Sequence, residues 1–445
     1  MRQRSVIIRI LTVIGLSAGA LGSPNFILIL TDDQSYVGSS ALMDPQNPET
    51  KSDYYQTPQI ERLMSMGMRF TQGYAPAPFC CPTRRSIQVG QTPARHLYQK
   101  DRDTWTQQYS EQLNIPRMLK QANPEYQTAH FGKWDHRFDD ITPQSQGYDF
   151  SNGYTSNRTG GGKGSGGPAD SDDPKLMHHI TQESIAFMSK QATNQTPFFL
   201  QISHYAVHLD IFYHQKTLEK TKTWKTGRRH RAPEFAAMTY DVDKTIGEIL
   251  DAVSDLKLAD STYIFFLSDN GGRNDLPKTL RGTLPRNHPL RDGKGSMYEG
   301  GIRVPFAIVG PDIPKESLSR VPVTGLDIFP TMAQLANYSK PLPKNIDGGN
   351  LLPVLRNGAG NVERDNPFLI FHHAVDRKAQ SAIRLGDFKL VKTWNGKKLE
   401  LFDLSKDLSE KRNLSAANPD KTRKLHSLMT NFLSDVGAET RQTED

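Results

Sequence analysis

The chain carries several short apolar runs, and polar residues follow three of them. Four such runs occupy residues 25–30 (NFILIL), 197–203 (PFFLQIS), 262–267 (TYIFFL) and 304–309 (VPFAIV). Short apolar runs without polar alternation are typical of strands that are buried on both faces of a parallel sheet. The pattern therefore predicts four buried parallel strands, with polar residues at the carboxyl ends of the first three.

Helical periodicity appears between these runs. One apolar stripe with spacings of three and four residues is made by Phe235, Met238, Val242, Ile246, Ile249 and Val253. Strands that alternate with helices indicate an α/β fold with a large, mainly parallel sheet covered by helices on both faces. In such folds ligands bind beyond the carboxyl ends of the strands.

The pattern changes after about residue 360. Residues 382–391 read as two short strands around a turn at Gly386-Asp387, residues 399–404 as a further strand, and residues 425–433 as a closing helix. This predicts a small C-terminal antiparallel sheet. We therefore divide the chain into a leader (1–20), a large catalytic domain (21–360) and a small subdomain (361–445), with no internal repeat.

The first residues resemble an export signal. Arg2, Arg4 and Arg9 accompany a short apolar run at residues 10–16, and Ala18-Gly19-Ala20 offers small residues for cleavage. An anchored N-terminal helix is the alternative. Neither this run nor any later one is long enough to span a bilayer. We expect an exported protein, periplasmic or secreted, without a membrane span.

The net charge only weakly limits the kinds of partner or substrate that the protein can bind. The formal net charge is +7 on 445 residues, with 36% hydrophobic residues. Such a mild excess does not indicate nucleic-acid binding, and it is compatible with an enzyme that acts on an anionic substrate.

Acidic residues follow two of the expected strands. Asp32 and Asp33 come directly after the first, and Asp269 and Asn270 after the third. A single such Asp is usually a helix cap or a turn former. Carboxylates that converge would repel one another, and a hard divalent cation with oxygen ligands removes that conflict. The paired arrangement predicts a calcium or magnesium site.

The chain has two cysteines, and they are adjacent, at Cys80 and Cys81. Adjacent cysteines rarely form a disulfide with each other, because the ring that they would close is strained. They open the string C-C-P-T-R, and Gly90 follows six residues after Arg84. Taken alone, the string is also compatible with a buried thiol beside a turn.

The string C-x-P-x-R with its later glycine resembles the signature of the formylglycine-dependent (type I) sulfatases. The second cysteine resembles the glucosamine-6-sulfatase branch of that family. Further segments resemble the family in chain order, at residues 24–34, 132–134 (GKW), 204–208, 268–272 (SDNGG) and 294–303. The resemblance implies an alkaline-phosphatase-like α/β fold, one calcium ion per chain, and a maturation system that converts Cys80 to formylglycine (3-oxoalanine).

The resemblance also implies roles for single residues. The calcium ligands would be Asp32, Asp33, Asp269, Asn270 and the modified Cys80. Arg84 would orient the nucleophile, at the start of a helix expected near Thr83. Sulfate oxygens would be held by Lys133, Lys294 and His208, with His208 also protonating the departing oxygen. In the second step of the family mechanism the sulfate is expelled and the aldehyde is regenerated. His136 would remove a proton from the hydrated formylglycine in that step.

Position 136 departs from the common family pattern G-K-W-H. Here the histidine stands three residues after Lys133, in Gly132-Lys133-Trp134-Asp135-His136. Either Asp135 or His136 therefore occupies the family histidine position.

Several polar segments have two readings. The Gly-rich stretch 151–170 is either a flexible surface loop or a loop that helps to select the substrate. His372, His373 and Arg377 are either substrate-binding residues at the edge of the cleft or ordinary loop residues.

The favoured function is hydrolysis of sulfate esters on a sulfated carbohydrate or polysaccharide. The alternatives are a small-molecule arylsulfatase, a phosphodiester or phosphonate hydrolase of the same superfamily, and an inactive protein that binds sulfated glycans. Phosphatase relatives mostly use Ser or Thr as nucleophile and several His ligands, which the C-x-P-x-R string and the Asp-rich ligand set argue against.

Overall fold

The computed structural model describes residues 22–95, 109–136, 141–160, 172–274, 276–373, 379–396 and 398–440. The leader, Arg377 and residues 161–170 of the Gly-rich stretch lie outside the described residues.

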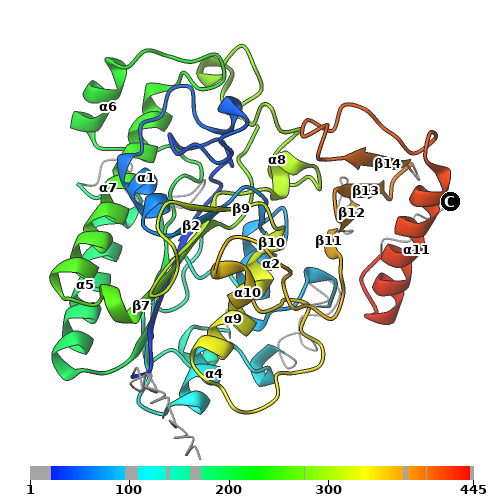
Figure 1. The fold of residues 1–445 in the computed structure, drawn as a ribbon. Helices are drawn as coiled ribbons and strands as arrows, with labels where there is room; N and C mark the ends of the chain where they lie inside the picture. Colours follow the sequence, from blue (N-terminus) through cyan, green and yellow to red (C-terminus); the bar gives the residue numbers. More distant parts are fainter. Residues whose placement is uncertain are drawn as a thin grey trace, which may run out of the picture.

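The large domain is built on an eight-stranded sheet with the order β5-β4-β6-β1-β7-β8-β2-β9 (Figure 1). Its strands are β1 (Asn25–Thr31), β2 (Met68–Phe70), β4 (Gln127–Gly132), β5 (Phe150–Ser151), β6 (Phe198–Ser203), β7 (Thr262–Ser268), β8 (Phe306–Val309) and β9 (Ser317–Ser319). A separate pair is formed by β3 (Gly73–Tyr74) and β10 (Val323–Thr324).

Four neighbouring strands of this sheet, β4, β6, β1 and β7, run parallel, as the apolar runs predict for three of them. The prediction was wrong for the direction of β8, which pairs antiparallel with β7. Residues that lead into β8 therefore lie beside the carboxyl end of β7, because Leu267 is level with Phe306. This reversal places the segment around Lys294 at the same edge as the acidic clusters.

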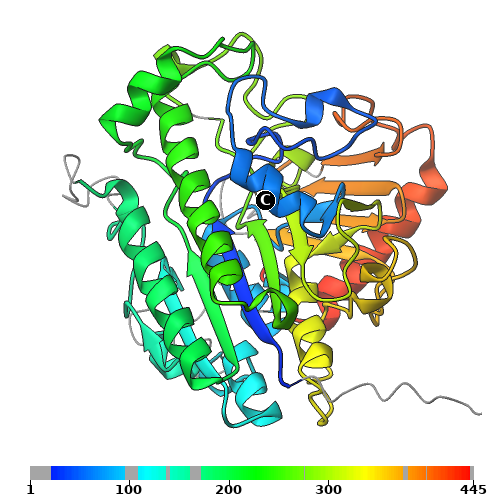
Figure 2. The same cartoon turned by 60° about the vertical axis from the view of Figure 1, so that its left-hand side comes forward.

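Alternate residues of β1 pack into two different cores. Ile27 and Ile29 face a core shared with α1 (Pro58–Ser65), α5 (Met177–Asn194) and α7 (Pro233–Asp255). Phe26, Leu28 and Leu30 face a second core shared with α2 (Cys80–Val89), α4 (Ile115–Ala122) and α9 (Ile328–Leu335). Figure 2 shows α5 and α7 along one face of the sheet. Covering both faces explains why the strands are apolar without alternation.

Short helices complete the large domain. They are α6 (Gln215–Lys222), α8 (Glu299–Ile302) and α10 (Leu352–Leu355), with 3-10 turns η1 (Pro48–Thr50), η2 (Pro93–Arg95), η3 (Gln144–Gln146), η4 (Pro174–Leu176), η5 (Ala259–Ser261), η6 (Lys278–Leu280) and η7 (Gly325–Asp327).

The C-terminal part is an antiparallel sheet with one long helix, on the far side of the molecule from α5 and α7 (Figures 1 and 2). Its elements are β11 (Leu369–His373), β12 (Gln380–Leu385), β13 (Phe388–Thr393), β14 (Lys398–Asp403) and α11 (Pro419–Asp435). One face packs on α11 and the other on Tyr74, Met297 and Tyr298 of the large domain. The predicted hairpin turns at Gly386-Asp387, with φ +59° at Gly386.

The predicted fold class, a large mainly parallel sheet between helices with a small antiparallel sheet, is confirmed. The division near residue 360 stays a prediction. In the part of the chain that is described, no helix is long and apolar enough to cross a membrane.

Candidate active site

Four parallel strands end level with one another, and this brings the predicted site residues together. Register pairs Leu30 and Gly132 with Ser203, and Thr31 with Ser268. The next residues of the chain are therefore neighbours at one edge of the sheet. They include Asp32 after β1, Lys133 after β4 and Asp269 after β7.

Three oxygen atoms in this cluster are buried without a hydrogen-bond partner among the described residues. They are Oδ1 of Asp32, Oδ2 of Asp33 and Oδ1 of Asn270, and all three side chains are fully buried. The amide nitrogen of Asn270 donates to Asp33 Oδ1 at 2.7 Å, which leaves its oxygen for another partner. Buried polar atoms are rarely left unpaired. Carboxylate and amide oxygens suit a hard cation, so this donor set fits calcium or magnesium.

Histidine 208 extends the same cluster. Ligand atoms of Asp32, Asp33 and His208 all lie within 4.8 Å of one another. The Nε2 atom of His208 is 3.7 Å from Asp33 Oδ2, and its Nδ1 donates to the Leu209 carbonyl at 2.5 Å. Burial lowers the pKa of His208, although Asp33 opposes this. The nitrogen that faces the site is thus the one without the backbone contact.

Arg84 holds Asp269, the third acidic residue of the cluster. Its Nε and Nη2 atoms donate to one oxygen of Asp269 at 3.0 and 2.7 Å, and its Nη1 donates to the Lys133 carbonyl at 2.6 Å. Burial raises the pKa of Asp269 to about 6, with Asp32 adding to the rise and Arg84 opposing it. Arg84 therefore positions both Asp269 and the chain at Lys133.

Two lysines enter the cluster from different sides. Lys133 Nζ lies 2.5 Å from Asp32 Oδ2, and Lys294 Nζ lies 2.5 Å from Asp33 Oδ1. Burial works against both charges, but the carboxylates raise the pKa of each lysine above its ordinary value. Burial alone would raise the pKa of Asp32, yet Lys133 and the other cations hold it well below its usual range.

Cys80 is the first residue of α2 and keeps a partial opening to solvent. The sequence placed this helix start near Thr83, three residues later than the structure does. Charges that act on Cys80 include Lys133, Asp135, Lys294 and Asp32, so residue 80 lies near the cluster. Burial raises the pKa of the thiol, so that an unmodified Cys80 stays neutral near neutral pH. Cys81 is buried.

The structure separates the two residues that the sequence left as alternatives. Asp135 Oδ2 lies 3.4 Å from Lys133 Nζ, and its backbone is left-handed (φ +51°). His136 is fully buried, its ring stacks on Trp134 at 3.7 Å between centroids, and its Nδ1 is 3.1 Å from the Tyr109 hydroxyl. Asp135 therefore lies beside the lysine, and His136 lies in the aromatic layer next to it.

Glycines allow the loops around the site to approach closely. A Cβ at Gly132 (φ +96°) would meet the Ser203 carbonyl at 2.1 Å, and one at Gly271 would meet the Gly300 carbonyl at 1.9 Å. The Gly271 N–H also donates to the Gly301 carbonyl at 2.9 Å. The SDNGG and EGG segments are thus interlocked, which fixes Asn270 relative to the loop that carries Lys294.

Lys175 is a residue of this region that the sequence analysis missed. Its side chain is 4% exposed, its Nζ lies 5.0 Å from the centre of the Phe212 ring, and its backbone is left-handed (φ +59°). Burial lowers its pKa to about 8, with Asp32 opposing the shift. Only the burial of η4 reveals this lysine, because its neighbours in the sequence are ordinary loop residues.

The predicted residues of the small domain lie differently. His372 is buried, with Nδ1 2.7 Å from Ser381 Oγ and Nε2 2.6 Å from the Glu439 carbonyl, so both ring nitrogens are engaged within the small domain. His373 packs on Phe79, the residue before Cys80, at 4.5 Å between ring centroids. Of the two described residues, His373 is therefore the one that contacts the helix start of α2.

A cavity of about 560 Å³ lies at the opposite edge of the sheet, next to Pro24, Pro197 and Ser261. These residues precede β1, β6 and β7, so the cavity is roughly 20 Å from the strand tips, given the rise of about 3.3 Å per strand residue. It contains none of the predicted site residues.

Comparison with known proteins decides the family. The sulfatase family model matches residues 24–338, more than half of the chain, and a model for the N-sulphoglucosamine sulphohydrolase C-terminal region matches residues 288–438. The chain belongs to the sulfatase family. This sulfatase is accordingly an enzyme that hydrolyses sulfate esters.

The sulfatase is 26% identical to N-acetylgalactosamine-6-sulfatase of Canis lupus familiaris, over 85% of this chain and 74% of that protein. Ps i-CgsB, solved in complex with k-i-k-neocarrahexaose, has the same fold (TM-score 0.75, 24% identity, 95% of both chains covered). Phosphonate monoester hydrolase of Agrobacterium radiobacter shares the fold too (TM-score 0.67, 18% identity, 93% of this chain and 96% of that chain). The fold therefore does not specify the ester, and the site must do so.

Proposed function

We propose that this sulfatase removes sulfate from a sulfated carbohydrate, with Cys80 converted to formylglycine and one calcium ion held by Asp32, Asp33, Asp269 and Asn270. The observation that carries the proposal is the set of buried oxygens on Asp32, Asp33 and Asn270 that have no partner among the described residues, in a cluster close to Cys80. The names of the relatives, an N-acetylgalactosamine-6-sulfatase and a carrageenan-saccharide complex among them, support a carbohydrate substrate.

The charge of the pocket supports a bound cation. Four carboxylates line it, on Asp32, Asp33, Asp135 and Asp269, and three side-chain cations face them, on Arg84, Lys133 and Lys294. The formal sum of these groups is one negative charge, which would repel a sulfate ester. A divalent cation makes the sum positive, and it also lowers the pKa of a hydroxyl group beside it.

Formylglycine in its hydrated form supplies two hydroxyl groups, one of which attacks sulfur. The position of residue 80 at the first turn of α2 gives this group a further advantage. Free backbone N–H groups and the helix dipole favour negative charge at that end. In this arrangement Arg84 keeps Asp269 and Lys133 in place from the next turn of the same helix.

The remaining residues would handle the substrate. Lys133 and Lys294 end beside carboxylates of the cluster, where each would donate to a sulfate oxygen. His208 directs Nε2 toward the site while Nδ1 binds the Leu209 carbonyl, so Nε2 would donate to the leaving oxygen when the ring carries a second proton. Asp135 and His136 remain alternative proton acceptors for the second step. The contact of Asp135 with Lys133 favours Asp135.

Export belongs to the same proposal. The arginines and the apolar run of residues 1–20 support a periplasmic or secreted enzyme. Cys80 would be oxidised by a formylglycine-generating maturation system, so recombinant protein needs a host that provides one.

Sulfate release from defined substrates tests the proposal. Purified, matured enzyme is given sulfated mono- and oligosaccharides, 4-nitrophenyl sulfate, and phosphate and phosphonate monoesters, with Cys80→Ala as the matched control. We expect sulfate release from at least one sulfated saccharide and none with the control. Preference for the aryl ester would favour an arylsulfatase, preference for a phosphorus ester would favour the superfamily alternative, and equal release by Cys80→Ala would refute the mechanism.

A further inference from the structure

A cavity of about 370 Å³ opens beside the candidate active site. Its lining includes Tyr55, Arg229, His230, Asn274, Arg281 and Arg286. The volume lies within the range of about 300–1,000 Å³ that is usual for small-ligand sites. The catalytic pocket does not use any of these residues.

Direct contacts connect the cavity to the strand tip that carries Asn270. Asn274, four residues later, accepts a hydrogen bond at 2.9 Å from Asn287, which also donates to the Gly272 carbonyl at 2.8 Å. The same carbonyl accepts from the Lys294 N–H at 3.0 Å. One short stretch of backbone therefore borders both the catalytic pocket and the cavity.

Arg286 gives the cavity a buried positive charge. Its side chain is 7% exposed and its Cζ lies 3.8 Å from the centre of the Phe235 ring. Among the described residues, Nε has no hydrogen-bond partner, and no carboxylate oxygen lies within 4 Å of the guanidinium. The Nη1 atom makes a long contact of 3.3 Å with the Arg273 carbonyl. Burial lowers the pKa of Arg286, while the Tyr55 side chain, which shares a hydrogen bond with the guanidinium, and the charge of Asp33 oppose the shift. Among the described residues, Arg286 is therefore a buried guanidinium with no contacting carboxylate, which favours an anion as its partner.

The neighbouring arginine at position 229 is different and serves as a contrast. Its guanidinium donates to the carbonyls of Glu49, Lys51 and His288 at 2.6 Å, and Asp53 lies 3.7 Å from its Nε. Arg229 is therefore a structural residue, and its donors are used within the protein.

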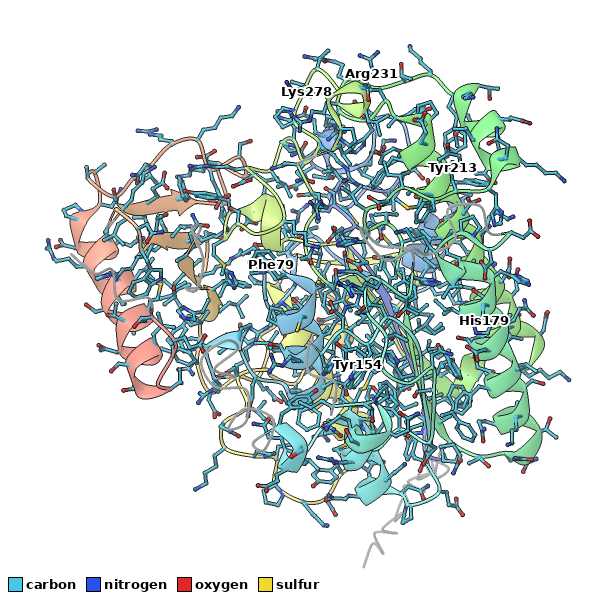
Figure 3. All side chains as sticks on the ribbon, turned by 180° about the vertical axis from the view of Figure 1, so that it is seen from behind. Phe79, Tyr154, His179, Tyr213, Arg231 and Lys278 are labelled. Atoms are coloured by element: carbon cyan, nitrogen blue, oxygen red, sulfur yellow. The ribbon has the colours of Figure 1, made fainter. Side chains whose placement is uncertain are left out.

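The two segments that border the cavity are strongly basic. Residues 225–231 (KTGRRHR) and 278–291 (KTLRGTLPRNHPLR) hold eight Lys or Arg residues and no Asp or Glu. They lie side by side, since the Leu284 N–H donates to the Arg228 carbonyl at 3.1 Å. Figure 3 shows Arg231 and Lys278 on the same face as Phe79, the residue before Cys80. A surface of this charge attracts a polyanion rather than a neutral glycan.

We propose that this cavity is a second anion subsite, which binds a sulfate or carboxylate group on a sugar next to the one whose sulfate ester is cleaved. Arg286 and Arg281 would donate to the anionic group, because guanidinium groups suit the paired oxygens of sulfates and carboxylates. The inference rests on the proposed carbohydrate substrate. Such a subsite makes the enzyme selective for saccharides that carry a further anionic group.

The test compares substrates that differ in this one group. Wild type, Arg281→Gln and Arg286→Lys are given a monosulfated monosaccharide, the same sugar linked to a neutral sugar, and the same sugar linked to a sulfated or a carboxylated sugar. Arg231→Gln is the matched control, because Arg231 is exposed and basic but is not part of the cavity lining. Thermal unfolding confirms that each variant is folded.

We expect Arg281→Gln and Arg286→Lys to raise KM for a dianionic disaccharide about 10-fold, as expected for loss of one hydrogen bond to a charged group. KM for the monosaccharide and the kcat values stay unchanged, and Arg231→Gln behaves as wild type. The sulfated and carboxylated arms identify which anion is bound.

Two results would overturn the inference while leaving the proposed function intact. One is wild-type KM values that are equal for neutral and anionic disaccharides. The other is an equal effect of the variants on all substrates, or of Arg231→Gln on the dianionic one. Failure of wild type to release sulfate from any saccharide would instead refute the proposed function together with the inference.

Discussion

Lys389 of β13 lies between two buried carboxylates, and replacing it provides a quantitative test of how the two domains are joined. Its Nζ is 2.8 Å from Glu299 Oε1 and 2.9 Å from Glu410 Oε1, and all three side chains are fully buried. Glu299 begins α8, which is interlocked with the Asn270 loop through the contact of Gly301 with Gly271. Lys389→Met keeps most of the apolar stem and removes the shared charge.

The expected loss of stability in Lys389→Met depends on the partners that Glu299 and Glu410 keep in the variant. Glu299 keeps Arg303 at 3.0 Å and the Tyr74 hydroxyl at 2.8 Å. Burial, with Glu299 adding to the effect, raises the pKa of Glu410 to about 7, so Glu410 can take up a proton at little cost. Breaking a buried ion pair costs about 3–5 kcal/mol. We therefore expect a loss near the lower limit, about 3 kcal/mol in the free energy of unfolding.

Denaturant unfolding of wild type, Lys389→Met and Lys398→Met measures this loss. Lys398 is the matched control, since it belongs to the next strand, is 59% exposed and pairs with Glu400 at 3.1 Å. Glu400 is buried but keeps Arg291 at 3.3 Å and the Tyr298 hydroxyl, so we expect removal of the exposed Lys398 charge to cost about 0–1 kcal/mol. If Lys389→Met lost no more stability than Lys398→Met, the buried network would not hold the domains together. We also expect a lower kcat/KM in the Lys389 variant, because α8 borders the site.

Three further predictions concern the site and the pH dependence. Cys80→Ala should abolish sulfate release while the far-ultraviolet circular dichroism spectrum stays as in wild type; retained turnover would contradict the nucleophile assignment. Calcium at about 100 times its Kd should raise the free energy of unfolding by about 2.7 kcal/mol. Asn270→Ala should need more calcium for the same rise. A chelator should abolish turnover. Because the folded-state pKa of Glu410 is raised from 4.5 to about 7, its contribution to stability is complete below pH 4.5 and is lost as the pH rises toward 7. Glu410→Gln should remove that part of the pH slope, and an unchanged slope would contradict the raised pKa.

The hydrophobic pattern was sufficient for the strands that carry the acidic residues. Apolar runs such as 25–30 are typical of buried parallel strands in an α/β chain. Polar residues that follow such strands therefore lie at one edge of the sheet. It was not sufficient for β4, whose sequence QTAHFG is mixed. In the structure His130 is buried there and its Nε2 lies 3.2 Å from Ser203 Oγ, a partner 73 residues away. The pattern also could not give the direction of β8, since an apolar run reads the same in both orientations.

Local backbone conformations and contacts between distant residues explain the other differences between the predicted and the observed structure. Asp135 reaches Lys133 because its backbone is left-handed, and Lys175 is buried because η4 carries the same unusual conformation. Neither conformation has a signal in the neighbouring residue types. The pairing of Lys389 with Glu299 joins residues 90 positions apart and needs the complete packing of the small sheet on the large domain.

Residue 80 is expected to be an oxidised side chain in the matured enzyme, and peptide mass spectrometry detects this oxidation. Tryptic peptides that contain Cys80 are compared between enzyme from a host with a formylglycine-generating system and enzyme from a host without one. We expect the peptide from the first host to be about 18 Da lighter at Cys80, because an aldehyde replaces the thiol, and we expect the modified fraction to parallel sulfate release. An unmodified thiol at Cys80 in fully active enzyme would refute the formylglycine mechanism.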